Sequence, residues 1–196
     1  ARVKMKDKVD SSVVEFFLDE GNYIGWLVPE DENVARIGVA SHANVSEHFL
    51  RLMKKRPGEI LGWQSGPIPV YNPHLEYEKD NVYLIGDAAT QVKATTGGGI
   101  IPSLKAAHTL CGCILGDKDY NKEFKKRSGR ELLLHLKIRN VLNKFSDKDY
   151  NHLLRLMNQE KVKKILKKYD RDTPIPLVFN LLLKEPRFLL FGKYAF

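Results

Sequence analysis

The segment at residues 82–100, VYLIGDAATQVKATTGGGI, constrains the fold of this chain more than any other stretch. Its first five positions form a compact apolar run, which is typical of a strand buried on both faces of a parallel sheet. Gly86 and Asp87 follow at the carboxyl end of that predicted strand, the edge at which open α/β sheets bind ligands. The sequence therefore predicts a strand–loop–helix unit with a ligand site at the strand end.

The residue types in this unit suit a ligand with hydroxyl groups and a partly anionic head. Glycine allows close approach to the backbone, and Asp87 offers two acceptor oxygens to hydroxyls. Gly97, Gly98 and Gly99 lead into a helix predicted from about Ile101 to Leu115, whose free N–H groups attract electron-rich atoms. A tight turn and a capped helix would explain each feature alone, but the combination at this spacing favours ligand binding.

The first 80 residues predict an antiparallel meander. Three β-rich runs lie at residues 12–19, 21–31 and 33–42, with turns at Gly21–Asn22 and Glu30–Asn33. A helix is expected to begin at Asn44 or Ser46 and to end near Arg56, before a Pro-Gly pair. Residues 59–71 then predict an edge strand or a bend, because two prolines interrupt them.

Residues 117–196 predict a helical lobe. Apolar positions recur at helical spacing through residues 119–145, and Ser146 with Asp149 forms a capping-box pattern for the next helix. A lysine-rich helix with an apolar stripe follows. Thr173 and Pro174 begin one more helix, and Pro186 interrupts the last apolar stretch.

Charge is distributed unevenly between the two parts of the chain. Residues 1–116 hold 12 basic and 14 acidic side chains, whereas residues 117–196 hold 20 basic and 10 acidic ones, a net charge of +10. An anionic lipid surface, a nucleic acid and a simply solvated helix face all fit this asymmetry.

The apolar runs and the cysteines indicate the expected location of the protein and the expected role of its thiols. No run reaches the ~18 apolar residues that cross a bilayer, and the first residues lack a hydrophobic signal segment, so a cytoplasmic protein is expected. Cys111 and Cys113 are too few for a disulfide framework and are expected to be small buried helix residues rather than a redox or metal pair. No metal site is predicted.

Residues 82–100 closely resemble the second flavin motif of the p-hydroxybenzoate-hydroxylase-like flavoproteins. They are most similar to the geranylgeranyl reductase branch, in which a strand-end GD precedes a loop resembling A-x-x-x-K-x-x-T-G-G-G-I. The helical tail extends the resemblance to residues 12–190. By position, the resemblance implies that Gly86 and Asp87 hold the ribityl or pyrophosphate region of FAD. It also implies that Gly97, Gly98, Gly99 and Ile100 bring the backbone to the flavin.

The fold implied by this resemblance is α+β. A β-meander that forms part of a substrate domain would span residues 1–80. One strand–loop–helix element of an FAD-binding α/β domain would span residues 81–116, and an all-helical C-terminal lobe would span residues 117–196. The family begins with a strand–GxGxxG–helix unit, which does not occur in these 196 residues. The chain is therefore expected to be the C-terminal portion of such a flavoprotein, with the N-terminal FAD-binding segment or subunit as a partner.

The resemblance also implies a substrate-side motif close to Y-x-W-x-F-P followed by a G-x-G strand end. Trp26 and Pro29 match it, whereas Ile24, Val28 and Ala40 depart from it. These departures leave the identity of the isoprenoid open, and a core aromatic is an equally good interpretation of the tryptophan.

The implied activity is reduction of double bonds in the prenyl chains of isoprenoid lipids, with FAD as the hydride donor and NAD(P)H or ferredoxin as the electron source. The expected partners are a prenylated lipid and an anionic membrane surface at which the protein is peripheral, without nucleic acid. No catalytic residue is assigned, because His42, His74 and His108 are better explained as structural or exposed. The alternatives are an aromatic monooxygenase of the same fold and a non-catalytic lipid-binding fragment.

Overall fold

The computed structural model describes residues 1–18, 24–170 and 172–195. It divides into two compact units, Ala1–Pro67 and Ile68–Phe196, which are described separately. The predicted turn at Gly21–Asn22 lies outside the described residues. The three-part division at residues 80 and 116 stays a prediction.

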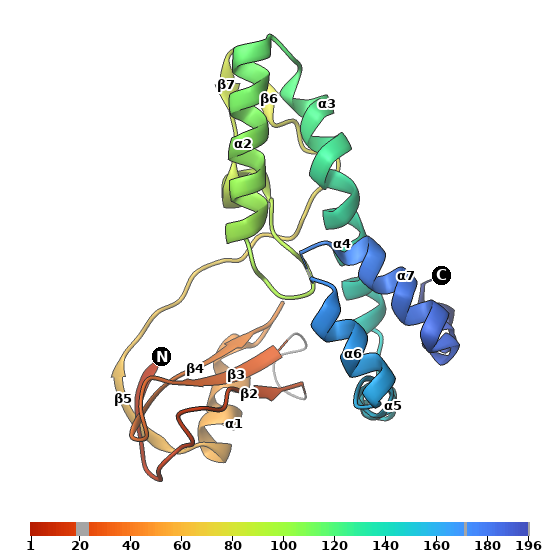
Figure 1. Cartoon of the computed structure of the whole chain (residues 1–196). Coiled ribbons are helices and arrows are strands. Elements are labelled where there is room, and N and C mark those ends of the chain that lie inside the picture. Colours follow the sequence, from red (N-terminus) through yellow and green to blue (C-terminus); the bar gives the residue numbers. More distant parts are fainter. Residues whose placement is uncertain (19–23, 171, 196) are drawn as a thin grey trace. The chain divides into compact units, whose positions relative to one another are not determined.

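The first unit is an antiparallel five-stranded sheet with one helix (Figure 1). The strand order is β2 (Glu15–Phe17), β3 (Ile24–Pro29), β4 (Val34–Ala40), β1 (Arg2–Met5) and β5 (Gly58–Gly62). The meander β2–β3–β4 matches the sequence prediction. The strand β1 was missed, although Val3 and Met5 alternate with charged residues in the pattern of a half-buried strand.

One face of this sheet forms the core of the unit together with helix α1 (Val45–Lys55). Leu27 and Ile37 are register partners on β3 and β4, and both are buried with Phe49 and Leu52 of the helix. Burial of each such side chain stabilises the fold by about 1.5–3 kcal/mol. Arg56, which follows α1, donates hydrogen bonds to the Glu15 carboxylate through its Nε and Nη2 and so connects the end of the helix to β2.

The start of α1 and the end of β5 differ in detail from the prediction. Asn44 precedes α1 as predicted, but its φ of 54° places it in the left-handed region and its side chain makes no capping hydrogen bond. The strand predicted over residues 59–71 ends at Gly62. The stretch beyond it, which contains Pro67 and Pro69, forms no ladder, because proline has no N–H group to donate.

The second unit is mainly helical. Its helices are α2 (Ile100–Gly116), α3 (Tyr120–Phe124), α4 (Arg130–Leu142), α5 (Asp147–Met157), α6 (Glu160–Lys168) and α7 (Pro174–Lys184), followed by 3-10 turns over Pro186–Tyr194. The single helical stretch predicted over residues 119–145 is interrupted by a π-turn at Lys125–Gly129. This wider turn brings Gly129 against the Tyr71 hydroxyl, where an added Cβ would lie 3.2 Å from the oxygen. Pro174 starts α7 as predicted, and the predicted interruption at Pro186 separates α7 from the 3-10 turns.

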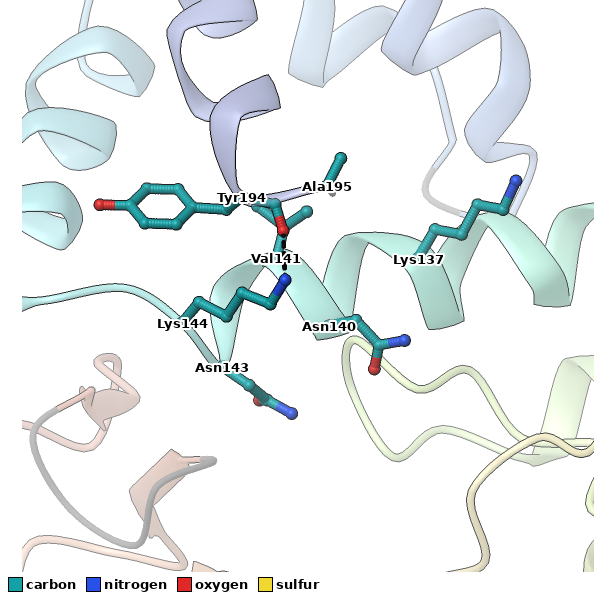
Figure 2. Close-up of a pocket in the computed structure, with 7 residues that line it drawn as sticks. All are labelled: Lys137, Asn140, Val141, Asn143, Lys144, Tyr194 and Ala195. Atoms are coloured by element: carbon teal, nitrogen blue, oxygen red, sulfur yellow. Dashed lines mark hydrogen bonds between the residues drawn. The ribbon is translucent and has the colours of Figure 1, made fainter.

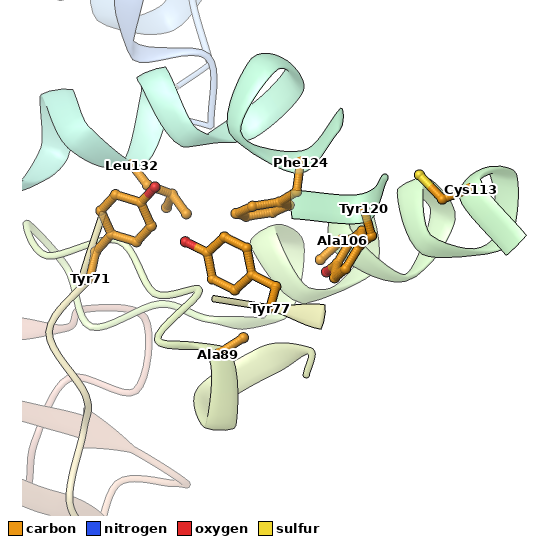
Figure 3. Close-up of a cluster of buried hydrophobic side chains, with 8 residues drawn as sticks. All are labelled: Tyr71, Tyr77, Ala89, Ala106, Cys113, Tyr120, Phe124 and Leu132. Atoms are coloured by element: carbon orange, nitrogen blue, oxygen red, sulfur yellow. The ribbon is translucent and has the colours of Figure 1, made fainter. Parts of the chain in front are cut away.

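A cluster of aromatic side chains forms the core of the second unit. Tyr77, Tyr120 and Phe124 are fully buried, and Figure 3 shows them gathered with Tyr71 and Leu132. The rings of Tyr77 and Phe124 meet edge to face with centroids 4.9 Å apart, a geometry that aromatic quadrupoles favour. Desolvation in this cluster raises the pKa of the Tyr71 and Tyr120 hydroxyls, which therefore stay neutral.

The strand predicted over residues 82–86, which was expected to pair with parallel strands from outside these 196 residues, is not formed in full within this chain. Only Val82–Tyr83 forms a strand, β7, and it pairs antiparallel with β6 (Glu78–Lys79). Val82 is 64% exposed, and Ile85 is exposed as well. A doubly buried strand needs parallel neighbours on both sides, and the described residues supply none, so this apolar run forms half of a short hairpin instead.

The expectation for the two cysteines is half correct. Both are free and lie on α2, where Cys113 is buried and Cys111 is exposed. Positions two apart on a helix point about 200° apart around the axis, so one helix face cannot bury both.

The capping box at the start of α5 is confirmed and yields a prediction about acid stability. Hydrogen bonds donated by Ser146 and by the Tyr194 hydroxyl hold the pKa of Asp149 at about 2. Because its pKa is lower in the folded state, Asp149 stabilises the fold above the ordinary aspartate pKa of about 3.9, and this stabilisation is lost as the pH falls towards 2.

We therefore expect the urea midpoint of Asp149→Asn to depend less on pH between about 5 and 2 than that of the parent chain. Asp147→Asn is the matched control, because Asp147 lies in the same helical turn and is exposed. Equal pH dependence of the parent chain and Asp149→Asn would show that the capping box is not formed in solution.

Candidate functional site

The turn that carries Gly86 and Asp87 is stabilised by a buried glutamine. Gly86 has a φ of 68°, which is in the left-handed region that favours glycine. Its N–H donates to the side-chain oxygen of Gln91 at 2.7 Å, and its carbonyl accepts from the Gln91 N–H at 3.0 Å. Gln91 is fully buried and also donates to the Tyr120 hydroxyl at 3.0 Å. The conformation of this turn is therefore determined by the aromatic core.

Asp87 lies against the beginning of α2. A Cβ built on Gly99 would be 3.0 Å from the Asp87 carboxylate oxygen, so the two residues, twelve positions apart, are adjacent in space. Asp87 is exposed, and within the described part of the chain its carboxylate accepts no hydrogen bond. The structure thus brings together the two sequence features that predicted a ligand site, and it leaves the carboxylate oxygens open to a ligand.

The glycines form a closed turn and then the N-terminus of α2. The Lys93 N–H donates to the Gly98 carbonyl, the Gly97 N–H donates to the Lys93 carbonyl, and Gly97 has a φ of 70°. Gly99 is the N-cap residue of the 17-residue helix and provides no side chain to cap it. Ile100 is 78% exposed. The N–H groups at the start of α2 therefore receive no hydrogen bond from an N-cap side chain.

Together these groups present one carboxylate acceptor next to a set of backbone donors at the positive end of a helix dipole. The carboxylate suits hydroxyl groups, and the donors suit electron-rich or anionic atoms. Serine at position 103 on α2 packs against Gly86, where an added Cβ would lie 3.4 Å from its hydroxyl oxygen. The strand-end turn and the first turn of α2 therefore form one compact surface, on which ligand contacts by Gly86, Asp87 and Gly97–Ile100 stay a prediction.

Sequence reasoning missed the polar residues that support this surface. Besides Gln91, they include Lys93, which is buried and forms an ion pair with Asp172, and Arg139, which is 6% exposed and donates to the backbone of the loop. The signal for Lys93 was present, because it stands at the lysine position of the family loop. Nothing in the periodicity of residues 119–145 marked Arg139, which is one of several basic residues on that stretch.

Trp26 and Pro29 lie on β3 of the first unit. The half-buried indole of Trp26 covers its register partner Gly38, where an added Cβ would lie 2.3 Å from the ring. A side chain at position 38 would therefore displace the indole. Phe16 of the neighbouring strand β2 is the register partner of Trp26, and its side chain is largely exposed. The substrate-side role of Trp26 and Pro29 stays a prediction.

The remaining candidates carry no site chemistry in the structure. His42, His74 and His108 are all exposed. In the described ranges no cluster of three or more His, Cys, Asp or Glu side chains could hold a metal ion. A cavity of about 400 Å³ on α4 is lined by two lysines and two asparagines (Figure 2), and Lys144 there donates to the Tyr194 carbonyl at 2.9 Å. It contains none of the predicted ligand residues.

Comparison with known proteins agrees with the predicted fold and the overall resemblance. No protein-family model matches the chain. It is 28% identical to a digeranylgeranylglycerophospholipid reductase of Methanothrix thermoacetophila over 84% of this chain and 48% of that protein. It is 25% identical to another of Methanocaldococcus jannaschii, over 94% of this chain and 51% of the relative.

A solved structure shares the fold. It is a geranylgeranyl bacteriochlorophyll reductase-like protein from Thermoplasma acidophilum, matched with a TM-score of 0.71 and 19% identity over the whole of this chain and 54% of that one. The chain spans about half the length of the curated relatives it matches. The α+β fold with a helical second part and the overall resemblance to the digeranylgeranylglycerophospholipid reductases are thereby confirmed.

Proposed function

We propose that this chain supplies part of the FAD site of a reductase that saturates double bonds in the prenyl chains of lipids. The observation that carries the proposal is the contact of the Asp87 carboxylate with Gly99 at the N-terminus of α2. The relatives named as prenyl-lipid reductases share most of the length of this chain. When bound, the reduced flavin would supply a hydride to one carbon of the double bond, and a proton would add to the other carbon.

The described residues fit the flavin half of this cofactor. The open carboxylate of Asp87 suits the ribityl hydroxyls. The uncapped N-terminus of α2 suits the electron-rich edge of the isoalloxazine ring. The bare backbone of Gly97–Gly99 allows a flat ring to approach closely, and Ile100 adds an exposed apolar side chain beside it.

An unactivated double bond needs a dry and shaped pocket that holds it over the donor. We assign the substrate-side role to the open face of the sheet, where Trp26 covers Gly38 beside the exposed Phe16. An aromatic monooxygenase of the same fold would consume oxygen during turnover with NAD(P)H, whereas a prenyl reductase would not, so oxygen uptake separates the two activities.

We extend the proposal to peripheral docking on an anionic membrane. Helix α7 exposes Phe179 (65%) and Leu183 (63%) four positions apart, and two further leucines, Leu189 and Leu190, are exposed in the following 3-10 turns. The helix packed beside it, α6, buries Val162 and Ile165 and turns its lysines outward. Apolar side chains next to a basic face are the composition of an interfacial helix surface. In the described part of the chain no helix is long and apolar enough to cross a membrane.

We expect Asp87→Asn to weaken FAD binding by the full-length reductase about fivefold, because a hydrogen bond to a charged acceptor is worth about 1 kcal/mol more than one to a neutral acceptor. Titration of flavin fluorescence measures the affinity. Asp117→Asn, at the opposite end of the same helix, is the control and should leave the affinity unchanged. Equal FAD affinity in the parent and Asp87→Asn would remove Asp87 from the site.

We expect the 196-residue chain by itself to bind FAD weakly or not at all. Its described residues offer the flavin half of the cofactor one helix N-terminus and one carboxylate, and its sequence has no GxGxxG unit for the pyrophosphate. The absorbance spectrum of the purified chain decides this. Stoichiometric flavin in that spectrum would contradict the expectation and would locate the whole site within these residues.

We expect the chain to co-sediment with anionic vesicles at low salt and to be released at high salt. Replacing Lys164, Lys167 and Lys168 by glutamine should weaken binding about a hundredfold, because each basic residue near the surface contributes ~1 kcal/mol. The control removes the same charge from Lys118, Lys122 and Lys126, which are exposed around α3. An equal loss of vesicle binding in both triple variants would show that the net charge, rather than the α6 face, determines binding. Binding to neutral vesicles but not to anionic ones would exclude the electrostatic mechanism.

A further inference from the structure

The loop between Gln91 and α2 has two carbonyl groups that its own turn does not use. The turn from Lys93 to Gly98 is closed by hydrogen bonds to the Lys93 and Gly98 carbonyls. The carbonyl oxygens of Ala94 and Thr95 instead accept hydrogen bonds from a side chain of α4. Buried backbone carbonyls without a partner destabilise a fold, so the outer side of this loop depends on a residue that is more than forty positions away in the sequence.

Arg139 is that residue. Its Nε donates to the Ala94 carbonyl at 3.1 Å and its Nη2 donates to the Thr95 carbonyl at 2.8 Å, while the side chain is only 6% exposed. A guanidinium is planar and rigid, so two donors on consecutive carbonyls define the orientation of the intervening peptide as well as its position. A lysine ammonium can also donate to carbonyl oxygens, but it lacks the rigid planar geometry that defines the orientation of the peptide.

Further polar contacts act on the same loop. His135, one helical turn before Arg139 and also buried, lies 2.7 Å from the Thr95 hydroxyl through its Nδ1. Lys93 pairs with Asp172, just before α7, and Lys105 of α2 donates to the Asp172 carbonyl. The loop is thus held by α4 on one side and by the segment before α7 on the other.

Building on the FAD site proposed above, we propose that α4 positions the glycine turn for its ligand, with Arg139 as the positioning residue. Arg139 does not touch the ligand in this arrangement. It fixes the peptide between Ala94 and Thr95, which is two residues before Gly97, and through this turn it fixes the start of α2 at the N-cap residue Gly99. The helical part of the second unit then has a direct role in the geometry of the site.

Arg139→Met removes both hydrogen bonds that Arg139 donates to the loop carbonyls. A buried acceptor that loses its donor destabilises a fold, so we expect a lower thermal midpoint in this variant. The midpoint alone therefore does not separate a positioning role from a structural one. A purely structural arginine would lower the midpoint and leave the loop unchanged, whereas a positioning arginine also changes the loop.

The experiment measures the loop and the ligand separately. In the chain without ligand, amide hydrogen exchange at Lys93, Thr96 and Gly97 reports on the turn, because their acceptors lie within it. We expect exchange at these amides to rise about tenfold or more in Arg139→Met, as expected for the loss of one charge-assisted hydrogen bond, and to be partly restored in Arg139→Lys. Lys137→Met, an exposed cation on the same helix, is the control.

FAD affinity of the full-length reductase is the second readout, and we expect it to fall about tenfold in Arg139→Met. Unchanged exchange at the three amides in Arg139→Met overturns the proposal. Faster exchange in Arg139→Met with unchanged FAD affinity also overturns the role of Arg139 for this ligand, and limits Arg139 to ordering the loop. The result for Asp87→Asn then tests the proposed function: weaker FAD binding in that variant supports it, whereas unchanged FAD affinity in both variants means that the proposed function fails. If Arg139→Met lowers the thermal midpoint so far that the chain does not fold, amide hydrogen exchange and FAD affinity are measured in Arg139→Lys instead, and the same outcomes decide the proposal.

Discussion

The hydrogen bonds between Gly86 and Gln91 decide where the Asp87 carboxylate lies. The backbone must turn sharply after β7, and the positive φ of Gly86 makes this possible. Gln91 then uses both its backbone and its side chain to close the turn, and it is held in turn by the Tyr120 hydroxyl in the aromatic core. Loss of the Gln91 side chain would leave a buried N–H and a buried hydroxyl without partners, at a cost of about 1–3 kcal/mol for each.

How far the sequence predicts this structure depends on how local the determining interaction is. The capping box of Ser146 and Asp149 was predicted correctly because both partners lie within three residues and need only the helix backbone. The contact of Asp87 with Gly99 was predictable for a similar reason, since a strand end, a loop and a helix start form one continuous supersecondary unit.

Interactions between distant segments were not predictable. The run at residues 82–86 has the composition of a buried parallel strand, but burial depends on neighbouring strands, and the described residues provide only β6. The role of Arg139 depends on where α4 docks, which is more than forty residues from the loop it holds. Basic residues are frequent on the helices of this chain, so no local pattern distinguishes the buried one from its exposed neighbours.

The hydrogen bonds that close the loop have a consequence for binding. Gly97, Gly98 and Gly99 in succession would lose much conformational entropy if a ligand had to order them, because glycine has the largest backbone freedom to lose. Here the folded chain has already met that cost through the closed turn at Lys93–Gly98 and the two carbonyl contacts of Arg139. A ligand that meets the N-terminus of α2 therefore finds its donors in place. The free energy of its contacts then contributes to affinity instead of to ordering the backbone.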